Sequence, residues 1–319
     1  MSKRGLFGLT SSKEESKLII MPVPWDVTAS YGKGASLGPE AVLKASPQLD
    51  LYDYNYKDIY KMGIHMLPIS EQIKINNERY SQNSENQKGA INVASQELED
   101  EIYKITKHFL KEGKTLAVLG GDHSCPLGAH KAYLEHYEKD LSILHIDAHA
   151  DLRNAYQGYE QSHASIMFNL LKLKPKSITQ VGIRDFCESE FKLMESSDFL
   201  STYLDATLKE QAYDGVTWKE TCKDIINSLK SDHVYISFDI DGLSPEFCPN
   251  TGTPVPGGLS YNEAVYLIHQ LSISDKKIVG FDLCEVAPDQ NQENEWDGNV
   301  GARILYQLSC ASLSNKELS

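Results

Sequence analysis

The chain has 319 residues, of which 41% are hydrophobic and 24% are charged. This length suits one large domain or two small ones, and the composition is typical of a globular protein that buries a full core. The net charge of −14 argues against nucleic acid and anionic membranes as partners, which attract basic surfaces. It would favour a small cationic ligand, and the alternative is that it only increases solubility.

The six cysteines are scattered along the chain and form no CxxC pair. This pattern indicates neither a zinc ribbon nor a disulfide framework, and reduced thiols in a cytoplasmic protein are the simplest interpretation. The N-terminal segment lacks the apolar core of a signal peptide. No run approaches the roughly 18 apolar residues of a membrane span. We therefore expect a cytoplasmic protein that has no membrane partner.

In chain order, the polar segment 1–16 predicts a loose N-terminal arm. Residues 18–24 predict a first strand, and the glycine-rich segment 30–38 predicts a loop leading into a helix that starts at Pro39. Its glycines match neither GxxxxGK[ST] nor GxGxxG, which argues against a phosphate-binding loop. Residues 71–90 are rich in Asn, Gln, Ser and Glu and predict a surface loop.

From residue 92 onward, amphipathic segments alternate with short apolar runs. The spacing of apolar residues predicts helices at 92–112, 126–136, 165–173, 218–229, 261–271 and 300–309. Apolar runs predict strands at 115–119, 141–147, 178–183, 233–238 and 277–283. This alternation predicts an α/β fold with a mostly parallel sheet covered on both faces. We expect residues 1–319 to form a single domain, with ligands bound at the carboxyl ends of its strands.

Side chains of the kind that bind metals follow three of these predicted strands. They occur after the runs at 115–119, 141–147 and 233–238. In an extended chain every second side chain points the same way, so those of one segment can converge. Carboxylates that lie so close together repel one another unless a cation lies between them. The candidate ligands are His123, Asp147, His149, Asp151, Asp239 and Asp241.

Four carboxylates and two imidazoles suit two divalent cations better than one. Two ions roughly 3.5–4 Å apart, with a bridging hydroxide, generate a nucleophile at neutral pH. Oxygen donors with some nitrogen and no sulfur favour manganese over zinc, and nickel, cobalt or iron are alternatives. His145 precedes Asp147 by two residues, so both side chains point to the same side of the strand. His145 lies deeper in the strand, so we interpret it as a supporting or core residue. Asp122 is either a turn residue or a supporting one.

Three motifs resemble those of the ureohydrolases, the family of arginases, agmatinases and their relatives. They are Gly120-Gly121-Asp122-His123-Ser124, Asp147-Ala148-His149-Ala150-Asp151 and Ser237-Phe238-Asp239-Ile240-Asp241-Gly242-Leu243. The resemblance extends from Pro22 to the final helix. It implies a three-layer α/β/α sandwich, two manganese ions and a homo-oligomer, either trimer or hexamer. It also implies one ion held by His123, Asp147, Asp151 and Asp239, and another held by Asp147, His149, Asp239 and Asp241.

The reaction implied by this resemblance is hydrolysis of a guanidinium group to urea and an amine. His163 matches the residue that would shuttle a proton to the leaving amine. Glu285 matches the carboxylate that would bind the guanidinium through two parallel hydrogen bonds. Thr253 would lie near the reacting group. The alternatives for these three residues are a surface histidine, a strand-end salt bridge and a turn threonine.

The segments around the second motif indicate the substrate. Residues 152–161 lack the arginase pattern that binds the amino-acid end of arginine, and Cys187 stands where arginases carry a second acidic residue. Residues 151–153 and 162–165 resemble prokaryotic agmatinases. We therefore expect agmatine, hydrolysed to putrescine and urea in polyamine biosynthesis. Guanidinobutyrate, guanidinopropionate, guanidine, arginine and formimidoylglutamate remain alternatives, and the sequence assigns no role to Arg153, Cys187 and Trp296.

Three other classes of protein compete with this interpretation. A two-metal phosphoesterase is disfavoured because the chain has neither a GNH[DE] motif nor a basic phosphate clamp. A deacetylase of related fold would use one zinc ion and would need neither His123 nor the second aspartate pair as ligands. An inactive binding homologue is disfavoured because all six candidate ligands are present.

Overall fold

The computed structural model describes residues 5–82, 87–289, 291 and 294–314. Eight strands form one sheet in the order β2-β1-β3-β8-β7-β4-β5-β6, and every paired neighbour is parallel. The α/β class predicted from the sequence is confirmed, with a sheet that is wholly parallel. The strands are β1 Leu18–Val23, β2 Ile64–Met66, β3 Thr115–Gly120, β4 Ser142–Ile146, β5 Ser177–Ile183, β6 Leu200–Leu204, β7 His233–Asp239 and β8 Lys277–Cys284.

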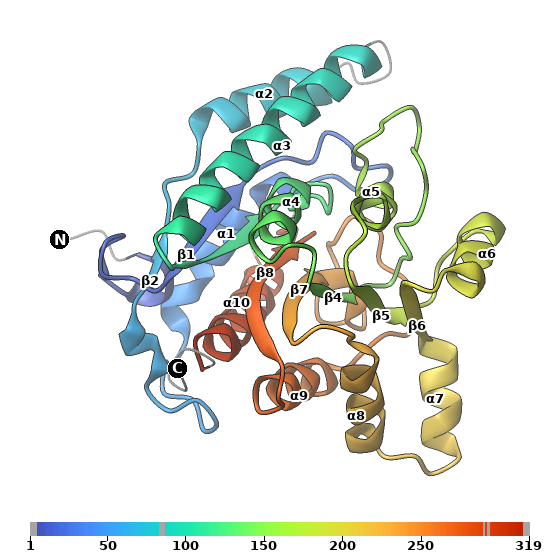
Figure 1. Cartoon of the computed structure of the whole chain (residues 1–319). Coiled ribbons are helices and arrows are strands. Elements are labelled where there is room, and N and C mark those ends of the chain that lie inside the picture. The colour runs from blue at the N-terminus through green and yellow to red at the C-terminus, as the bar shows by residue number, and fades with distance from the viewer. Residues whose placement is uncertain (1–4, 83–86, 290, 292–293, 315–319) are drawn as a thin grey trace.

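Helices cover both faces of this sheet (Figure 1). One face packs against α1, α7, α8, α9 and α10, and the other packs against α2, α3, α4 and α5. Successive residues of β1 alternate between these two cores, as the pleat of a strand requires. The helices are α1 Gly38–Ala45, α2 Glu71–Ser81, α3 Lys88–Lys111, α4 Leu127–His136, α5 Ile166–Leu173, α6 Glu188–Ser196, α7 Asp205–Tyr213, α8 Trp218–Ser228, α9 Tyr261–Ser272 and α10 Trp296–Ser314.

The prediction of a surface loop at 71–90 is wrong for most of these residues. Residues 71–81 form α2, and α3 begins at Lys88, while residues 83–86 lie outside the described part of the chain. The side chain of Ser70 caps α2 by accepting a hydrogen bond from the backbone N–H of Ile73 at 3.3 Å. Ile73 is buried in the core between α2 and the sheet. A narrow apolar stripe therefore stabilises a helix whose composition is mostly polar.

Residues 5–16 do not form the loose arm that the sequence predicts. Leu6 and Phe7 are buried, and the ring of Phe7 packs edge-on against Tyr306 of α10 at a centroid distance of 5.1 Å. The backbone N–H of Phe7 donates to the hydroxyl of Ser46 at 2.9 Å. The arm is thus attached to the core through a contact with a helix at the other end of the sequence. Residues 1–4 lie outside the described residues.

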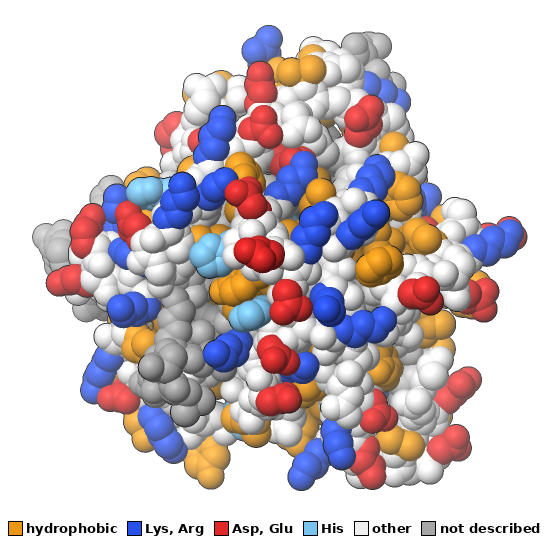
Figure 2. Space-filling view, in the orientation of Figure 1, with side chains coloured by type: hydrophobic (Ala, Val, Ile, Leu, Met, Phe, Trp, Pro, Cys, Tyr) orange, Lys and Arg blue, Asp and Glu red, His pale blue; other side chains and the backbone are white. Residues whose placement is uncertain are grey.

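The surface carries charges of both signs. On the face shown in Figure 2, basic and acidic side chains are interleaved, so the acidic excess forms no continuous patch there. In the part of the chain that the structure describes, no helix is both long enough and apolar enough to cross a membrane.

Arg184 joins three chain segments at the carboxyl edge of the sheet. Its Nη2 donates to the carbonyl oxygens of Asp241 at 2.8 Å, Leu243 at 3.1 Å and Val255 at 2.8 Å. Its Nη1 donates to the carbonyl of Gly182 at 3.2 Å, and Nε adds a second bond to Val255. The planar guanidinium suits this task because its donors diverge in fixed directions. Arg184 therefore fixes the end of β5 relative to the loops that follow β7.

We predict that Arg184→Met lowers the free energy of unfolding by roughly 2 kcal/mol or more, because several partly buried carbonyls lose a charged donor. Urea denaturation followed by circular dichroism measures this change. Arg303→Met is the matched control, since exposed Arg303 donates to the side chain of Asn299 from the surface of α10. Equal stability of the two variants would contradict the bracing role of Arg184.

Candidate metal centre

The six candidate ligands gather at the carboxyl ends of β3, β4 and β7. These strands lie near the middle of the sheet, with β8 between β3 and β7 and with β4 beside β7. In a parallel sheet all strands end at the same edge, so side chains from distant segments meet there. Gly121 permits the close approach of the β3 end to the segment after β1, since a Cβ there would lie 1.9 Å from the carbonyl oxygen of Trp25.

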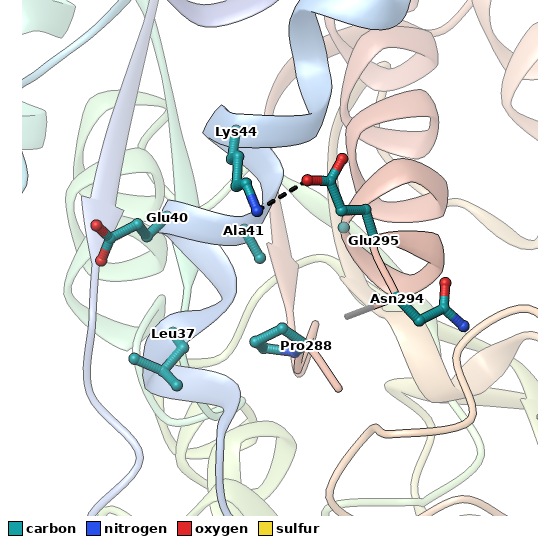
Figure 3. A pocket seen from close by; sticks show the side chains of 8 residues that line it. Leu37, Glu40, Ala41, Lys44, Pro288, Asn294 and Glu295 are labelled. Atoms are coloured by element: carbon teal, nitrogen blue, oxygen red, sulfur yellow. Dashed lines mark ion pairs between the residues drawn. The ribbon is translucent and has the colours of Figure 1, made fainter. Parts of the chain in front are cut away.

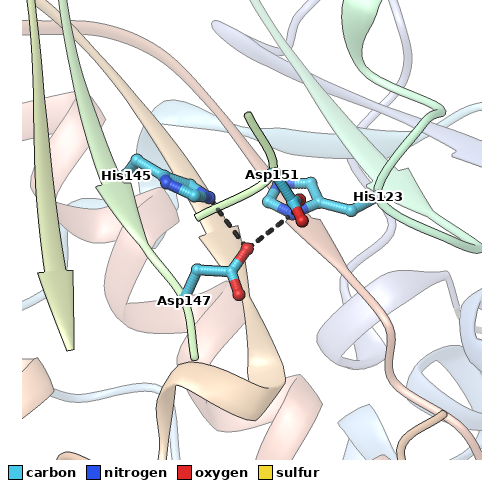
Figure 4. Close-up of side chains that lie close together, drawn as sticks. All are labelled: His123, His145, Asp147 and Asp151. Atoms are coloured by element: carbon cyan, nitrogen blue, oxygen red, sulfur yellow. Dashed lines mark hydrogen bonds and ion pairs between the residues drawn. The ribbon is translucent and has the colours of Figure 1, made fainter. Parts of the chain in front are cut away.

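The first group of ligand atoms surrounds His123. Its Nδ1 lies 3.0 Å from Asp147 Oδ2, 3.4 Å from Asp151 Oδ2 and 3.3 Å from Asp239 Oδ2. All four side chains are buried, and Figure 4 shows His123, Asp147 and Asp151 pointing toward one another. Asp151 adopts a left-handed backbone conformation with φ of 55°. A non-glycine residue in this region indicates local strain, which is often associated with functional sites.

The second group surrounds His149 and shares one aspartate with the first. His149 Nδ1 lies 3.0 Å from Asp241 Oδ2 and 3.5 Å from Asp147 Oδ1. Asp147 therefore faces His123 with one carboxylate oxygen and His149 with the other. Asp239 links the groups as well, because its Oδ1 accepts the backbone N–H of Asp241 at 2.9 Å. The structure thus brings all six predicted side chains together in two adjoining groups.

The electrostatics of this cluster fit a bound cation. Burial, reinforced by the charge of Asp147, raises the pKa of Asp151 to about 7. Burial and the charges of Asp241 and Asp147 raise the pKa of Asp239 well above its usual range. Burial would lower the pKa of His149, but Asp241 and Asp147 outweigh it and raise that pKa to about 12. These oxygen and nitrogen donors, crowded and buried, fit the preferences of divalent cations, whose charge would offset the repulsion.

His145 supports Asp147, as its position in the sequence suggested. Its Nε2 lies 2.8 Å from Asp147 Oδ2, the carboxylate oxygen that also faces His123 (Figure 4). Asp122 supports the neighbouring loops, because it accepts hydrogen bonds from the hydroxyls of Thr28 and Ser124. Thr28 in turn accepts the backbone N–H of His163 at 3.1 Å.

Sequence reasoning missed Ser237, Asp282 and His130, which lie beneath His123. Ser237 Oγ lies 2.9 Å from His123 Nε2 and donates to Asp282 Oδ1 at 3.1 Å. His130 Nε2 lies 3.1 Å from the other oxygen of Asp282. The sequence signal for this group was Asp282, a charged residue inside the apolar run of β8. A buried aspartate requires polar partners, so its presence there indicates that polar side chains lie nearby.

A pocket of about 130 Å³ lies beside the second group. Thr253 lines it, and its hydroxyl donates to Asp241 Oδ2 at 3.3 Å. His163 lines it too, with Nε2 3.1 Å from the hydroxyl of Ser30. Burial, together with the charge of His149, lowers the pKa of His163 to about 4. The lining residues are Ser30, His149, Asp151, Arg153, Tyr156, His163, Ala164, Asp185, Glu190 and Thr253.

Glu285 lies behind the first group and is not among the residues that line this pocket. It is buried, and its Oε1 accepts the backbone N–H of His123 at 3.0 Å. Burial and the charge of Asp122 raise the pKa of its carboxyl well above the usual range. Its backbone is left-handed, with φ of 63°. Glu285 is therefore placed beside His123 and held in a strained conformation.

The three residues without an assigned role differ in location. Arg153 lines the pocket, with its guanidinium 4.6 Å above the ring of Tyr156 and its Nε 3.6 Å from Glu190. Cys187 precedes α6 and donates its backbone N–H to Glu190 at 2.9 Å. Trp296 begins α10 and donates its indole N–H to the carbonyl of Glu246. It is not among the residues that line the pocket.

A second cavity lies between α1 and the start of α10 (Figure 3). Its wall includes the ion pair between Lys44 and Glu295 at 2.8 Å. The cavity is lined by Leu37, Glu40, Ala41, Lys44, Pro288, Asn294, Glu295 and Gly298. These residues come from other segments than the six candidate ligands, so we assign the chemistry to the pocket beside His149.

Comparison with known proteins identifies the family. The Arginase family model matches residues 16–310. An N(1)-aminopropylagmatine ureohydrolase of Thermus thermophilus is 33% identical over 296 residues, covering 92% of this chain and 89% of that protein. An agmatinase of Halalkalibacterium halodurans is 30% identical over 286 residues, covering 87% of this chain and 86% of the relative.

A solved structure shares both fold and sequence features. The agmatine ureohydrolase of Thermoplasma volcanium superposes with a TM-score of 0.79 at 27% identity, covering 100% of this chain and 97% of that one. The matched segment 16–310 contains every strand of the sheet and all six candidate ligands. This chain therefore belongs to the arginase family and is a hydrolase that acts on the carbon–nitrogen bonds of guanidino compounds.

Proposed function

We propose that this protein is a binuclear metal hydrolase that converts agmatine and water to putrescine and urea. The observation that carries the proposal is the sharing of Asp147 between two groups of ligand atoms. His123 faces one oxygen of this carboxylate at 3.0 Å and His149 faces the other at 3.5 Å. A bridging carboxylate between two imidazole-bearing sites suits a pair of closely spaced ions.

His123 and Asp151 would hold one ion, and His149 and Asp241 would hold the other. Asp147 and Asp239 lie between the two groups and would contribute to both sites. Manganese suits this oxygen-rich donor set, and nickel, cobalt or iron are alternatives. Two divalent ions, when bound, lower the pKa of a water molecule that they share and so supply a nucleophile at neutral pH.

The remaining roles are assigned to Glu285, which lies beside His123, and to His163 and Thr253, which line the pocket. Glu285 binds and orients the guanidinium, since a carboxylate offers it two parallel hydrogen bonds. His163 transfers a proton to the leaving amine. Burial lowers the pKa of its imidazole, so the ring is neutral at pH 7 and can accept a proton before it donates one. Thr253 holds Asp241 at the edge of the pocket.

The pocket favours a substrate whose tail is cationic. Besides the candidate metal ligand Asp151, two carboxylates line it, those of Asp185 and Glu190, together with the guanidinium of Arg153. The side chain of Asp185 is 65% exposed and lies at the solvent side, where it would attract an ammonium group. A carboxylate-bearing substrate would meet a net repulsion from these two acids.

N(1)-aminopropylagmatine is the second candidate substrate. Three relatives that are 28–33% identical carry the name N(1)-aminopropylagmatine ureohydrolase. This molecule has the same guanidinium end as agmatine and a longer cationic tail, so the chemistry proposed for the metal centre applies to both. We also propose that the chain works as a single catalytic domain in a cytoplasmic homo-oligomer, either a trimer or a hexamer.

A substrate panel tests the proposed function. Urea release is measured with the manganese-loaded protein, and in parallel with nickel, on agmatine, N(1)-aminopropylagmatine, arginine, guanidinobutyrate, guanidinopropionate, formimidoylglutamate and guanidine. We expect kcat/KM for agmatine to exceed that for arginine and for the carboxylate-bearing compounds by at least about tenfold, because of the charge at the pocket. Preference for N(1)-aminopropylagmatine would favour the second candidate. Preference for arginine or guanidine would contradict both.

We predict that His163→Asn lowers kcat for agmatine by about 100-fold or more, since proton transfer to the leaving amine contributes 10²–10⁴-fold in such reactions. The variant should retain its manganese, because the ring lies in the pocket wall with Ser30 as its partner. His136→Asn, at the exposed end of α4, is the matched control. A kcat for His163→Asn within about twofold of the control would rule out the proton-transfer role.

A further inference from the structure

A row of polar side chains crosses the sheet beneath the candidate metal centre. Its members are register partners on neighbouring strands: Thr202 of β6 pairs with Gln180 of β5, which pairs with His145 of β4. Beyond β4 the row continues through Ser237 of β7 to Asp282 of β8. Strands of a parallel sheet that is covered on both faces are usually apolar throughout, so such a row is unusual.

The part of this row that runs from β6 to β4 is connected by hydrogen bonds. Gln180 and His145 have no exposed surface. The hydroxyl of Thr202 donates to Gln180 Oε1 at 3.1 Å. Gln180 Nε2 donates to the carbonyl of Ala150 at 2.8 Å and lies 3.0 Å from His145 Nδ1. Buried polar groups are tolerated when they are hydrogen-bonded in this way, although apolar side chains would fill the same space at less risk to stability.

The connections determine where the proton of His145 lies. The amide nitrogen of Gln180 can donate but cannot accept, so Nδ1 of His145 must be the acceptor. The reverse orientation of the amide would set Gln180 Oε1 against the carbonyl oxygen of Ala150. A neutral His145 therefore carries its proton on Nε2 and donates it to Asp147 Oδ2 at 2.8 Å.

We propose that Gln180 and Thr202 are positioning residues for the metal centre. They fix the tautomer of His145, and His145 then holds Oδ2 of Asp147 toward His123. The backbone N–H of His149 holds the other oxygen, Oδ1, at 2.6 Å. Hydrogen bonds thus orient both carboxylate oxygens of Asp147. Their remaining lone pairs point toward the ligand atoms around His123 and around His149. This inference rests on the proposed function, because it assigns Asp147 to both ions.

Two isosteric variants and one control test this positioning role. Gln180→Met removes both amide donors, and Thr202→Val removes the hydroxyl that orients the amide. Thr179→Val is the control, because Thr179 is adjacent to Gln180 in β5 and this substitution removes a partly buried hydrogen bond to Ser228 at 2.8 Å, which does not involve His145. The readouts are manganese affinity by calorimetric titration and the His145 tautomer by ¹⁵N-histidine NMR, with His145→Asn identifying the resonances.

We expect one Nε2–H tautomer of His145 in the wild-type protein and a mixture of tautomers in Gln180→Met. Manganese affinity should fall by about 10–100-fold in Gln180→Met, as is typical when a residue supporting a metal ligand is removed, while Thr179→Val stays within about twofold of wild type. Thr202→Val should show a smaller loss in the same direction. If Gln180→Met does not fold, the manganese affinity and the His145 tautomer of Thr202→Val test the positioning role in its place.

A single tautomer and unchanged manganese affinity in the folded variants would overturn the positioning role. An Nδ1–H tautomer in the wild-type protein would overturn it as well. If the wild-type protein binds no manganese, nickel, cobalt or iron, the proposed function fails. The NMR comparison of wild type with Gln180→Met then decides alone whether the row fixes His145.

Discussion

The structure depends on the crowding of carboxylates around Asp147. Burial removes the screening that water would give these charges, so their mutual repulsion is large unless opposite charge is close by. Histidines on both sides supply part of that charge, and Asp151 and Asp239 respond with raised pKa values. The repulsion within such a cluster lowers the stability of the fold, so we expect it only where the cluster serves a function. Its presence at the carboxyl edge of a parallel sheet is the physical reason for assigning the chemistry to this place.

Rigid supports hold this cluster in position from three directions. Arg184 fixes the loop that carries Asp241 through bonds to backbone carbonyls. Ser237 lies under His123, and His145 lies beside Asp147. These supports are side chains in or next to strands rather than in mobile loops, so the geometry of the cluster is set by the register of the sheet. Metal sites whose ligands are oriented in this way bind their ions more tightly.

The sequence predicted the fold class and the six clustered residues because both depend on local pattern. Apolar runs identify strands, polar residues that follow them identify the edge, and the ends of parallel strands meet there. The supports were missed because the partnership between Gln180 and His145 depends on strand register, which periodicity within one segment does not determine. For the same reason the burial of Phe7 was missed, since its partner Tyr306 lies at the far end of the chain. The polar composition of α2 concealed its single buried face around Ile73.

The most direct measurement is anomalous diffraction at the manganese absorption edge from crystals of the manganese-loaded protein. We expect two peaks roughly 3.5–4 Å apart, one near His123 and one near His149, with the carboxylate of Asp147 between them. A single peak, or two peaks that do not both contact Asp147, would contradict the claim that two ions share this aspartate.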